Sequence, residues 1–430
     1  MNIDLKILER YSGLYGSVKR FSERITDAEL RELFLRCCLN TLTTTVRETQ
    51  DDVYLITGDI DAMWLRDSSA QVLQYLELAP QEKDTQSLIK GLLRRQCYYI
   101  CCDPYANAFN FEWNGNGHSE DECERLPVVM ERKFELDSLC YPIMLSDIYW
   151  RKTGDIGIFG GRFAEAMKKV LDVFETEQDH STSPYYHYRP TEPPEFSVPN
   201  RGRGGKCAVT GMVWSGYRPS DDPCVYGYNI PGNLFVVTAM RSLEKIASAL
   251  GLTETARRAE RLAASVEEGV LRYGVVEHAE YGKIYAYETD GLGNYLFMDD
   301  ANVPNLLGLP YIGWKDMHDE IYRNTRKFVL SEANPWYFKG KALSGIGSPH
   351  TPGRYVWPIS LMMQGITSDD GAEINALVRM LAETTGGTGY MHESVNVDND
   401  KDFSRPWFAW ANSLFAYFLI VKADKIEGIK

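Results

Sequence analysis

Residues 233–251 read NLFVVTAMRSLEKIASALG, and residues 253–274 read TETARRAERLAASVEEGVLRYG. In both stretches apolar residues recur at intervals of three and four, which is the period of one face of an α-helix. Only the turn Gly251-Leu252-Thr253 separates them. We therefore expect a pair of amphipathic helices joined by a short turn.

The same period recurs along nearly the whole chain. It predicts further helices over residues 28–42, 67–78, 84–100, 134–152, 163–177, 317–331, 357–366, 370–386 and 406–423. Longer segments rich in Gly, Pro, Trp, Asn and Asp lie between the helical pairs, at residues 57–64, 109–127, 189–223, 298–306, 338–355 and 389–406. This alternation predicts an all-α fold in which helical hairpins form a ring and the loops gather at one end. A helical protein of two domains has the same periodicity, but no shift of composition marks a boundary, so we expect one domain over residues 1–430.

Composition and charge exclude several classes of protein. The 430 residues are 44% hydrophobic and 25% charged, as in an ordinary globular protein. Lys and Arg total 46 against 60 Asp and Glu, and no basic run is present, so we expect no nucleic-acid partner. No segment approaches 18 uncharged apolar residues, and Asp4, Lys6 and Glu9 interrupt the N-terminal stretch. We expect a cytoplasmic protein without a membrane partner.

The nine cysteines point to reduced thiols in the core, because most of them lie in apolar, helix-like stretches. Only Cys97, Cys101 and Cys102 have a metal-like spacing, and no second pair of ligands follows them. The chain contains no HExxH, GxxxxGKT or GxGxxG motif. We therefore expect no metal and no other cofactor.

The polar loops contain the residue types that bind carbohydrate. Aromatic planes stack on the apolar faces of sugar rings, and Asp, Asn and Arg hydrogen-bond to sugar hydroxyls. Any one tryptophan can equally serve the core, but their position in polar loops favours a sugar ligand. These loop tryptophans are Trp64, Trp113, Trp214, Trp336, Trp357 and Trp407.

Two loops contain candidate catalytic carboxyl groups. Asp221 and Asp222 are adjacent in GYRPSDDP, where two like charges would raise one pKa and favour a general acid. Glu393 lies in the Gly-rich loop GTGYMHESVNVDND. Hydrolysis of a glycosidic bond needs one carboxyl group to protonate the leaving oxygen and a second to activate water or attack the sugar. A turn or helix cap at Asp221 and a solvated loop carboxylate at Glu393 are the competing interpretations.

Arg66 and Asp67 follow Trp64 at the start of a predicted helix. A guanidinium beside a carboxylate can hold neighbouring sugar hydroxyls by donating and accepting hydrogen bonds. The competing interpretation is a pair that caps its own helix. Of the seven histidines, His118, His350 and His392 lie in polar loops, where we favour sugar contacts over metal binding.

Several long motifs resemble glycoside hydrolase family 125. They are TGDIDAMWLRDSSAQVLQYL, MERKFELDSLCYP, MVWSGYRPSDDPCVYGYNIPGNLF, FMDDANVPNLLGLPY, GIGSPHTPGRYVWP and TGYMHESVNVDN. The resemblance implies an (α/α)6 toroid related to glucoamylases. It also implies an exo-acting, inverting, metal-independent α-mannosidase that removes terminal mannose from α-1,6-linked mannosides of the N-glycan type. Asp61 departs from the family pattern, in which we expect proline.

The resemblance assigns the general acid to the RPSDD motif and the general base to Glu393. We favour Asp221 as the acid and Asp222 as a sugar-binding neighbour, although the motif leaves either open. Arg66 and Asp67 would hold the terminal mannose. The further expected substrate contacts are Asp59, Trp64, Asp300, Asn302, His350 and His392.

Inversion requires a water molecule between the two carboxyl groups, which predicts a separation of about 6.5–9.5 Å. Three other functions remain open at this point. A sugar epimerase or isomerase would need a histidine pair for deprotonating carbon, and a glycan-binding protein would need no acid or base. A hydrolase specific for glucosides would use the same loops.

Overall fold

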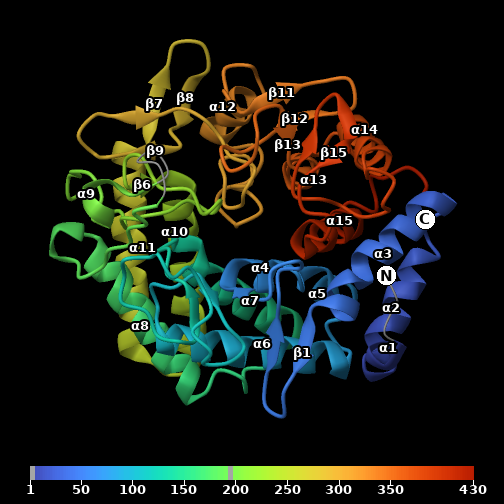
Figure 1. Cartoon of the computed structure of the whole chain (residues 1–430), viewed down its shortest axis with the longest axis horizontal. Coiled ribbons are helices and arrows are strands. Elements are labelled where there is room, and N and C mark those ends of the chain that lie inside the picture. Colours follow the sequence, from blue (N-terminus) through green and yellow to red (C-terminus); the bar gives the residue numbers. More distant parts are fainter. Residues whose placement is uncertain (1–4, 192–196) are drawn as a thin grey trace. The chain divides into compact units, whose positions relative to one another are not determined.

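The structure of the protein is a computed structural model that describes residues 5–191 and 197–430 (Figure 1). The chain forms two compact units. Unit 1 contains the described residues up to Arg95, together with Ile148–Ile158 and Tyr337–Lys430. Unit 2 contains Gln96–Asp147 and the described part of Phe159–Trp336. Two long helices, α6 (Lys83–Cys102) and α7 (Leu136–Thr153), contain residues of both units.

Unit 1 is built around α15 (Ala409–Val421), one of the most apolar helices of the chain. This helix packs against α3 (Ala28–Thr44), α5 (Leu73–Leu78) and α13 (Pro358–Ile366). The remaining helices of this unit are α1 (Leu5–Arg10), α2 (Ser12–Ser22), α4 (Leu65–Ala70) and α14 (Gly371–Glu383).

Polar contacts fix the position of α15 within that apolar core. Cys37 lies 3.2 Å from the Asn412 side chain, and the hydroxyls of Thr41 and Ser413 are 2.9 Å apart. A Cβ atom on Gly365 would lie 2.4 Å from the Phe418 ring, so α13 and α15 approach more closely than a larger residue permits. The N-terminal and C-terminal parts of the chain thus share one core.

Unit 2 contains the predicted helical pair, α10 (Ile230–Ala249) and α11 (Thr253–Tyr273), which lie side by side (Figure 1). The Asn229 side chain caps α10 by accepting a hydrogen bond from Gly232. Helix α11 also packs against α8 (Gly161–Glu177) and buries small residues such as Ala259 and Ala263. The other helices of this unit are η1 (His180–Thr182), α9 (Pro199–Gly202) and α12 (Glu320–Val329).

Short strands line the loops of both units. In unit 1 they are β1 (Val46–Glu48), β2 (Val53–Leu55), β3 (Met63–Trp64), β11 (Tyr337–Lys339), β12 (Ser344–Ile346), β13 (Tyr355–Val356), β14 (Val395–Asn396) and β15 (Asn399–Phe403). In unit 2 they are β4 (Ala108–Phe109), β5 (Val129–Glu131), β6 (Tyr228–Asn229), β7 (Val275–His278), β8 (Gly282–Tyr285), β9 (Glu288–Thr289) and β10 (Tyr295–Leu296). The pairs β1–β2, β4–β5, β7–β8, β11–β12 and β14–β15 are antiparallel.

The helices predicted from the sequence are confirmed, with ends that differ by a few residues. The prediction of one continuous helix over residues 67–78 is wrong. The segment forms two short helices, because α4 ends at Ala70 and α5 begins at Leu73. The Ser69 hydroxyl bonds to the carbonyl of Leu65 and so competes with the helical ladder at that point. The strands and the helices α1 and α2 were not predicted.

All nine cysteines are free, as predicted, and five of them are buried. Across residues 5–191 and 197–430, every helix is too short or too polar to cross a bilayer.

One buried ion pair fixes the base of the loop that contains Asp221. The Asp121 carboxylate is 1% exposed and accepts hydrogen bonds from Arg189 Nε (2.6 Å) and from the His187 ring (3.1 Å). The other nitrogen of His187 contacts the Tyr217 hydroxyl, at the start of the loop 217–223. Burial would raise the pKa of Asp121, but the hydrogen bonds and charges of His187 and Arg189 hold it well below its ordinary range.

We predict that Asp121→Asn lowers the free energy of unfolding by about 3 kcal/mol at neutral pH, because it removes one partner of a buried ion pair. Since the pKa of Asp121 is depressed in the folded state, its stabilising contribution is complete above its unfolded pKa of about 3.9 and disappears as pH falls. Urea unfolding of wild type and variant between neutral and acid pH measures this. A stability difference that does not shrink below about pH 4 would contradict the assignment.

Candidate active site

The predicted site residues fall into two clusters, one in each unit. Unit 1 contains Asp59, Trp64, Arg66, Asp67, His350, His392 and Glu393, and unit 2 contains Asp221, Asp222, Asp300 and Asn302. Most of these side chains are buried or partly buried, although they lie in loops or at helix ends.

Glu393 lies just before β14 and is 6% exposed. Both of its carboxylate oxygens contact the segment that follows β15. Oε2 accepts a hydrogen bond from the Ser404 hydroxyl at 2.8 Å, and Oε1 lies 3.3 Å from Arg405 Nη1. The backbone N–H of Ser404 donates to the carbonyl of Ser394, so the β14–β15 hairpin brings Ser404 beside Glu393.

Arg405 also binds Asp59, which lies in the loop between β2 and β3. Its Nη2 and Nε donate to Asp59 Oδ1 at 2.6 and 2.9 Å, and Nη2 donates to Thr57 Oγ1 at 3.2 Å. Burial would lower the pKa of Arg405, but Asp59, Glu393 and Asp67 raise it above its ordinary value. Arg405 was not among the residues predicted from the sequence. The signal was present as an arginine before proline in the polar loop 389–406.

Arg66 and Asp67 form the first turn of α4 and are almost fully buried. Arg66 Nε lies 3.4 Å from Asp67 Oδ2, and the guanidinium lies over the ring of Trp410 at 5.8 Å. Trp64 precedes this turn. Its indole Nε1 is buried and has no hydrogen-bond partner among the described residues. A buried donor of this kind requires an explanation such as a ligand or an ordered water.

The two predicted histidines have different surroundings. His392 is buried and stacks on Phe403, with ring centroids 3.7 Å apart. Its Nε2 lies 3.0 Å from the Thr388 hydroxyl, and its Nδ1 lies 3.3 Å from the carbonyl of Arg405. Burial lowers the pKa of this imidazole. His350 is exposed, and its ring meets Trp357 edge to face.

In unit 2, Asp221 lies in a tight turn within residues 217–223. The Asp221 N–H donates to the carbonyl of Arg218, and the Arg218 N–H donates to the carbonyl of Asp222. Pro219 occupies the position at which its fixed φ suits a type I turn. Asp221 has a φ of 65°, in the left-handed region that follows the turn in a three-residue hairpin loop. Aspartate tolerates this region better than most residues.

The Asp221 carboxylate shares an amide donor with two glutamates. Asn107 Nδ2 lies 3.1 Å from Asp221 Oδ1, 2.9 Å from Glu131 Oε2 and 3.4 Å from Glu135 Oε1. Lys133 Nζ lies 3.4 Å from Glu131 Oε1. Burial would lower the pKa of Lys133, but Glu131 and Asp221 hold it above its ordinary value. The sequence analysis singled out Asp221 alone in this cluster.

Asp222 and Asp300 form a second acidic group of unit 2. Asp222 Oδ2 accepts a hydrogen bond from the Ser220 hydroxyl at 2.7 Å. Asp300 is fully buried and accepts hydrogen bonds from the backbone N–H and the side-chain amide of Asn302, at 2.9 and 3.0 Å. Burial and the charge of Asp222 raise the pKa of Asp300. The structure thus brings together three of the predicted residues.

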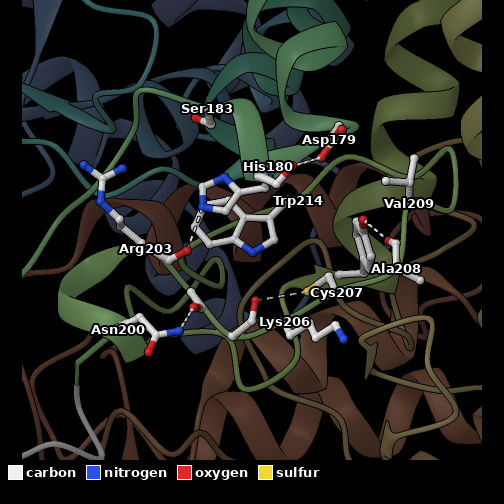
Figure 2. Close-up of a pocket in the computed structure, with 14 residues that line it drawn as sticks. Asp179, His180, Ser183, Asn200, Arg203, Lys206, Cys207, Ala208, Val209 and Trp214 are labelled. Carbon is white, nitrogen blue, oxygen red and sulfur yellow. Dashed lines mark hydrogen bonds between the residues drawn. The ribbon is translucent and has the colours of Figure 1, made fainter.

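A cavity of about 380 Å³ in unit 2 lies among residues that the sequence analysis did not assign to the site. Figure 2 shows its central feature, the imidazole of His180 stacked on the indole of Trp214. The two ring centroids are 3.4 Å apart, and His180 also contacts Glu177 at 2.6 Å. Trp214 is therefore a buried structural residue, not an exposed surface for stacking a sugar.

Within residues 5–191 and 197–430, no group of three or more His, Cys, Asp or Glu side chains is placed to hold a metal ion.

Each of the two clusters contains a carboxyl group whose oxygens contact hydrogen-bond donors. Glu393 has a hydroxyl and a guanidinium beside it, and Asp221 has an amide. Carboxyl groups held in this way are suited to general acid and base chemistry.

The fold is similar to that of a solved enzyme with little sequence identity to this chain. A bacterial glucoamylase solved with acarbose matches 91% of this chain and 55% of its own, with a TM-score of 0.61 and 12% identity. Identity this low establishes the helical fold and nothing finer.

The family is established by closer matches. The model of the metal-independent α-mannosidases, glycoside hydrolase family 125, matches residues 27–420, and the chain belongs to this family. The protein is thus an α-mannosidase, and the resemblance noted in the sequence is confirmed.

Two individual proteins illustrate how close these matches are. A metal-independent α-mannosidase of Streptococcus pneumoniae, solved in a non-productive complex with α-1,6-mannobiose, is 42% identical over 99% of both chains, with a TM-score of 0.92. The meiotically up-regulated gene 157 protein of Schizosaccharomyces pombe is 41% identical over 94% of this chain and 84% of its own length.

The left-handed conformation of Asp221 gives a stability prediction. Asp221→Gly and Asp221→Ala both remove the carboxyl group, but only glycine adopts a φ of 65° without steric cost. We expect the glycine variant to be more stable than the alanine variant by about 1 kcal/mol. Thermal unfolding measures the difference. Equal stability of the two variants would show that residue 221 is not left-handed in solution.

Proposed function

We propose that the protein is an exo-acting, inverting mannosidase that removes terminal mannose from α-1,6-linked mannosides. The observation that carries this proposal is the match along almost the entire chain to the S. pneumoniae enzyme solved with α-1,6-mannobiose. We also propose that the substrates of this protein include oligosaccharides of the N-glycan type.

We further propose that residues 1–430 form one catalytic domain of the (α/α)6 toroid type. The support is the length of the matches, because both the glucoamylase and the S. pneumoniae enzyme match over at least 91% of this chain.

In the proposed reaction Glu393 is the general base and Asp221 the general acid. Glu393 removes a proton from water, whose oxygen attacks the anomeric carbon of the terminal mannose. The bond from that carbon to the glycosidic oxygen breaks, and Asp221 donates its proton to the leaving oxygen. The products are β-mannose and an alcohol, through a transition state that resembles an oxocarbenium ion.

The surroundings of the two adjacent aspartates support Asp221 as the acid. Asp221 lies near Glu131 and Glu135, and negative charges close to a carboxyl group favour its protonated form. Lys133 opposes this effect in part. Asp222 instead accepts a hydrogen bond from Ser220 and lies near the buried Asp300, which suits a residue that binds a sugar hydroxyl.

Arg66, Asp67 and Trp64 are proposed to hold the terminal mannose. The ion pair of Arg66 and Asp67 offers both donors and acceptors, and the indole N–H of Trp64 is a buried donor that lacks a partner among the described residues. Asp300, Asn302, His350 and His392 remain weaker candidates for sugar contacts.

The nine free thiols support a cytoplasmic location for the enzyme. Cys37 and Cys38 are adjacent and buried, and disulfides are rare in a reducing compartment. An enzyme placed there would act on oligosaccharides that reach the cytoplasm.

The stereochemical proposal is tested by incubating the enzyme with α-1,6-mannobiose in the presence of a chelator and following released mannose by proton NMR. We expect β-mannose to form first. Asp221→Asn and Glu393→Gln should each lower kcat at least about 10²-fold, the range that a general acid or base contributes. Release of α-mannose would overturn the inverting mechanism, and absence of cleavage would favour an epimerase, a glucosidase or a binding protein.

The role of Trp64 is tested by Trp64→Phe, which keeps an aromatic ring and removes the indole N–H. We expect kcat/KM for α-1,6-mannobiose to fall about tenfold, because one hydrogen bond of about 1.4 kcal/mol is lost in the complex. Trp314→Phe provides the matched control, since the Trp314 N–H is buried and already bonds to the Tyr285 hydroxyl. The control should lose thermal stability with little change in kcat/KM, whereas an unchanged kcat/KM in Trp64→Phe would exclude the sugar contact.

A further inference from the structure

Glu393 is held almost entirely by one short segment of chain. Ser404 donates to one carboxylate oxygen, and Arg405 lies beside the other. A carboxylate with one fixed donor on each oxygen has its plane and its remaining lone pairs fixed in direction. A general base needs this property, because its free lone pair must point at the water that it deprotonates.

Arg405 adopts a conformation that the chain does not favour by itself. Its φ is 44°, in the left-handed region, and it precedes Pro406, a position that further restricts the backbone. Such strain costs on the order of 1–3 kcal/mol and persists only where surrounding contacts maintain it.

The contacts that maintain Arg405 come from several elements. Asp59 accepts two hydrogen bonds from the guanidinium, and Thr57 accepts one. The guanidinium lies over the ring of Phe408 at 4.5 Å, and the carbonyl of Arg405 lies 3.3 Å from His392 Nδ1. The Asp59 N–H donates to the carbonyl of Trp407, which ties the loop containing Asp59 to the same segment.

We propose that Arg405 is the positioning residue of the general base, and that Asp59 acts through it. Arg405 bridges the carboxylates of Asp59 and Glu393 and fixes the orientation of Glu393. This inference rests on the proposed function, in which Glu393 is the base. In this inference Asp59 holds Arg405, whereas the sequence predicted that Asp59 contacts the sugar directly.

The charges around Glu393 explain why the guanidinium is needed. The carboxylates of Asp59 and Asp67 and the guanidinium of Arg66 belong to the same group of side chains as Arg405. His392 adds no charge near neutral pH, because burial lowers its pKa. Removing Arg405 would leave three carboxylates with one cation. Glu393 would then hold its proton to a higher pH.

The test uses the full chain with α-1,6-mannobiose and measures the pH dependence of kcat/KM, whose acidic limb reports the general base of the free enzyme. In Arg405→Gln we expect this limb to move to higher pH by about one unit or more and kcat to fall at least about 10²-fold. KM should change much less. Arg405→Lys keeps a cation without the planar fork, so its limb should stay near the wild-type position while kcat still falls.

A matched control is available in the same unit. Arg354 is also left-handed, with a φ of 67°, and pairs with Asp398 at 2.7 Å, but its partner is not Glu393. Arg354→Gln should leave the acidic limb and kcat unchanged. Asp59→Asn removes one of the carboxylates and keeps the cation, so its limb should move to lower pH, and kcat should fall because Arg405 loses its anchor. This variant provides the test if Arg405→Gln does not fold. Thermal unfolding of each variant verifies that it is folded.

The outcomes separate this inference from the proposed function. If Glu393→Gln keeps its activity, Glu393 is not the base, and the proposed function and this inference both fail. If Glu393→Gln is inactive but the acidic limb of the folded Arg405→Gln variant stays at its wild-type position, the inference alone is overturned. An unchanged kcat and an unmoved limb in Asp59→Asn would overturn it in the same way. A loss of kcat without movement of the limb would make Arg405 a residue of purely structural importance.

Discussion

Burial of an ionised carboxylate is costly unless hydrogen-bond donors or cations lie close to its oxygens. The buried carboxylates in the loops of this enzyme all have such neighbours. Glu393, Asp121 and Glu288 are all buried or nearly so, and each has an arginine beside it. The pairs of Asp121 and Glu288 join segments far apart in the chain, and Arg405 joins the Glu393 loop to the distant Asp59. These ion pairs offset the desolvation cost of the buried carboxylates, and they also fix the positions of the loops.

The helices supply a rigid base for these loops. In unit 1, α15 packs against helices from both ends of the chain, and the segment containing Arg405 leads directly into it. In unit 2, α10 begins just after the Asp221 turn, and the side chain of Asn229 caps it. Side chains on loops that are anchored at a helix start can be held precisely enough for chemistry, because the adjoining backbone has little freedom.

The sequence was sufficient for the helices and for the residues with a local signature. The period of the apolar residues predicted α3, α6, α10 and α11, and the adjacent aspartates and the glutamate in a Gly-rich loop stood out by composition. Arg405 and Asn107 were not predicted, because their importance comes from partners distant in the chain, such as Asp59 for Arg405 and Asp221 for Asn107. At the break between α4 and α5, the buried Gln71 bonds to the carbonyl of Ile56, a partner that the local sequence does not show.

Asp221 and Arg405 both occupy the left-handed region, so the two loops hold backbone strain at residues that we propose serve the reaction. Natural enzymes commonly trade stability for activity at such positions. A mutant library selected only for heat resistance would accumulate glycine there, since glycine relieves the strain and selection of that kind does not detect the lost carboxyl or guanidinium group. Directed evolution of this enzyme toward higher temperature therefore has to couple every round to an assay of turnover.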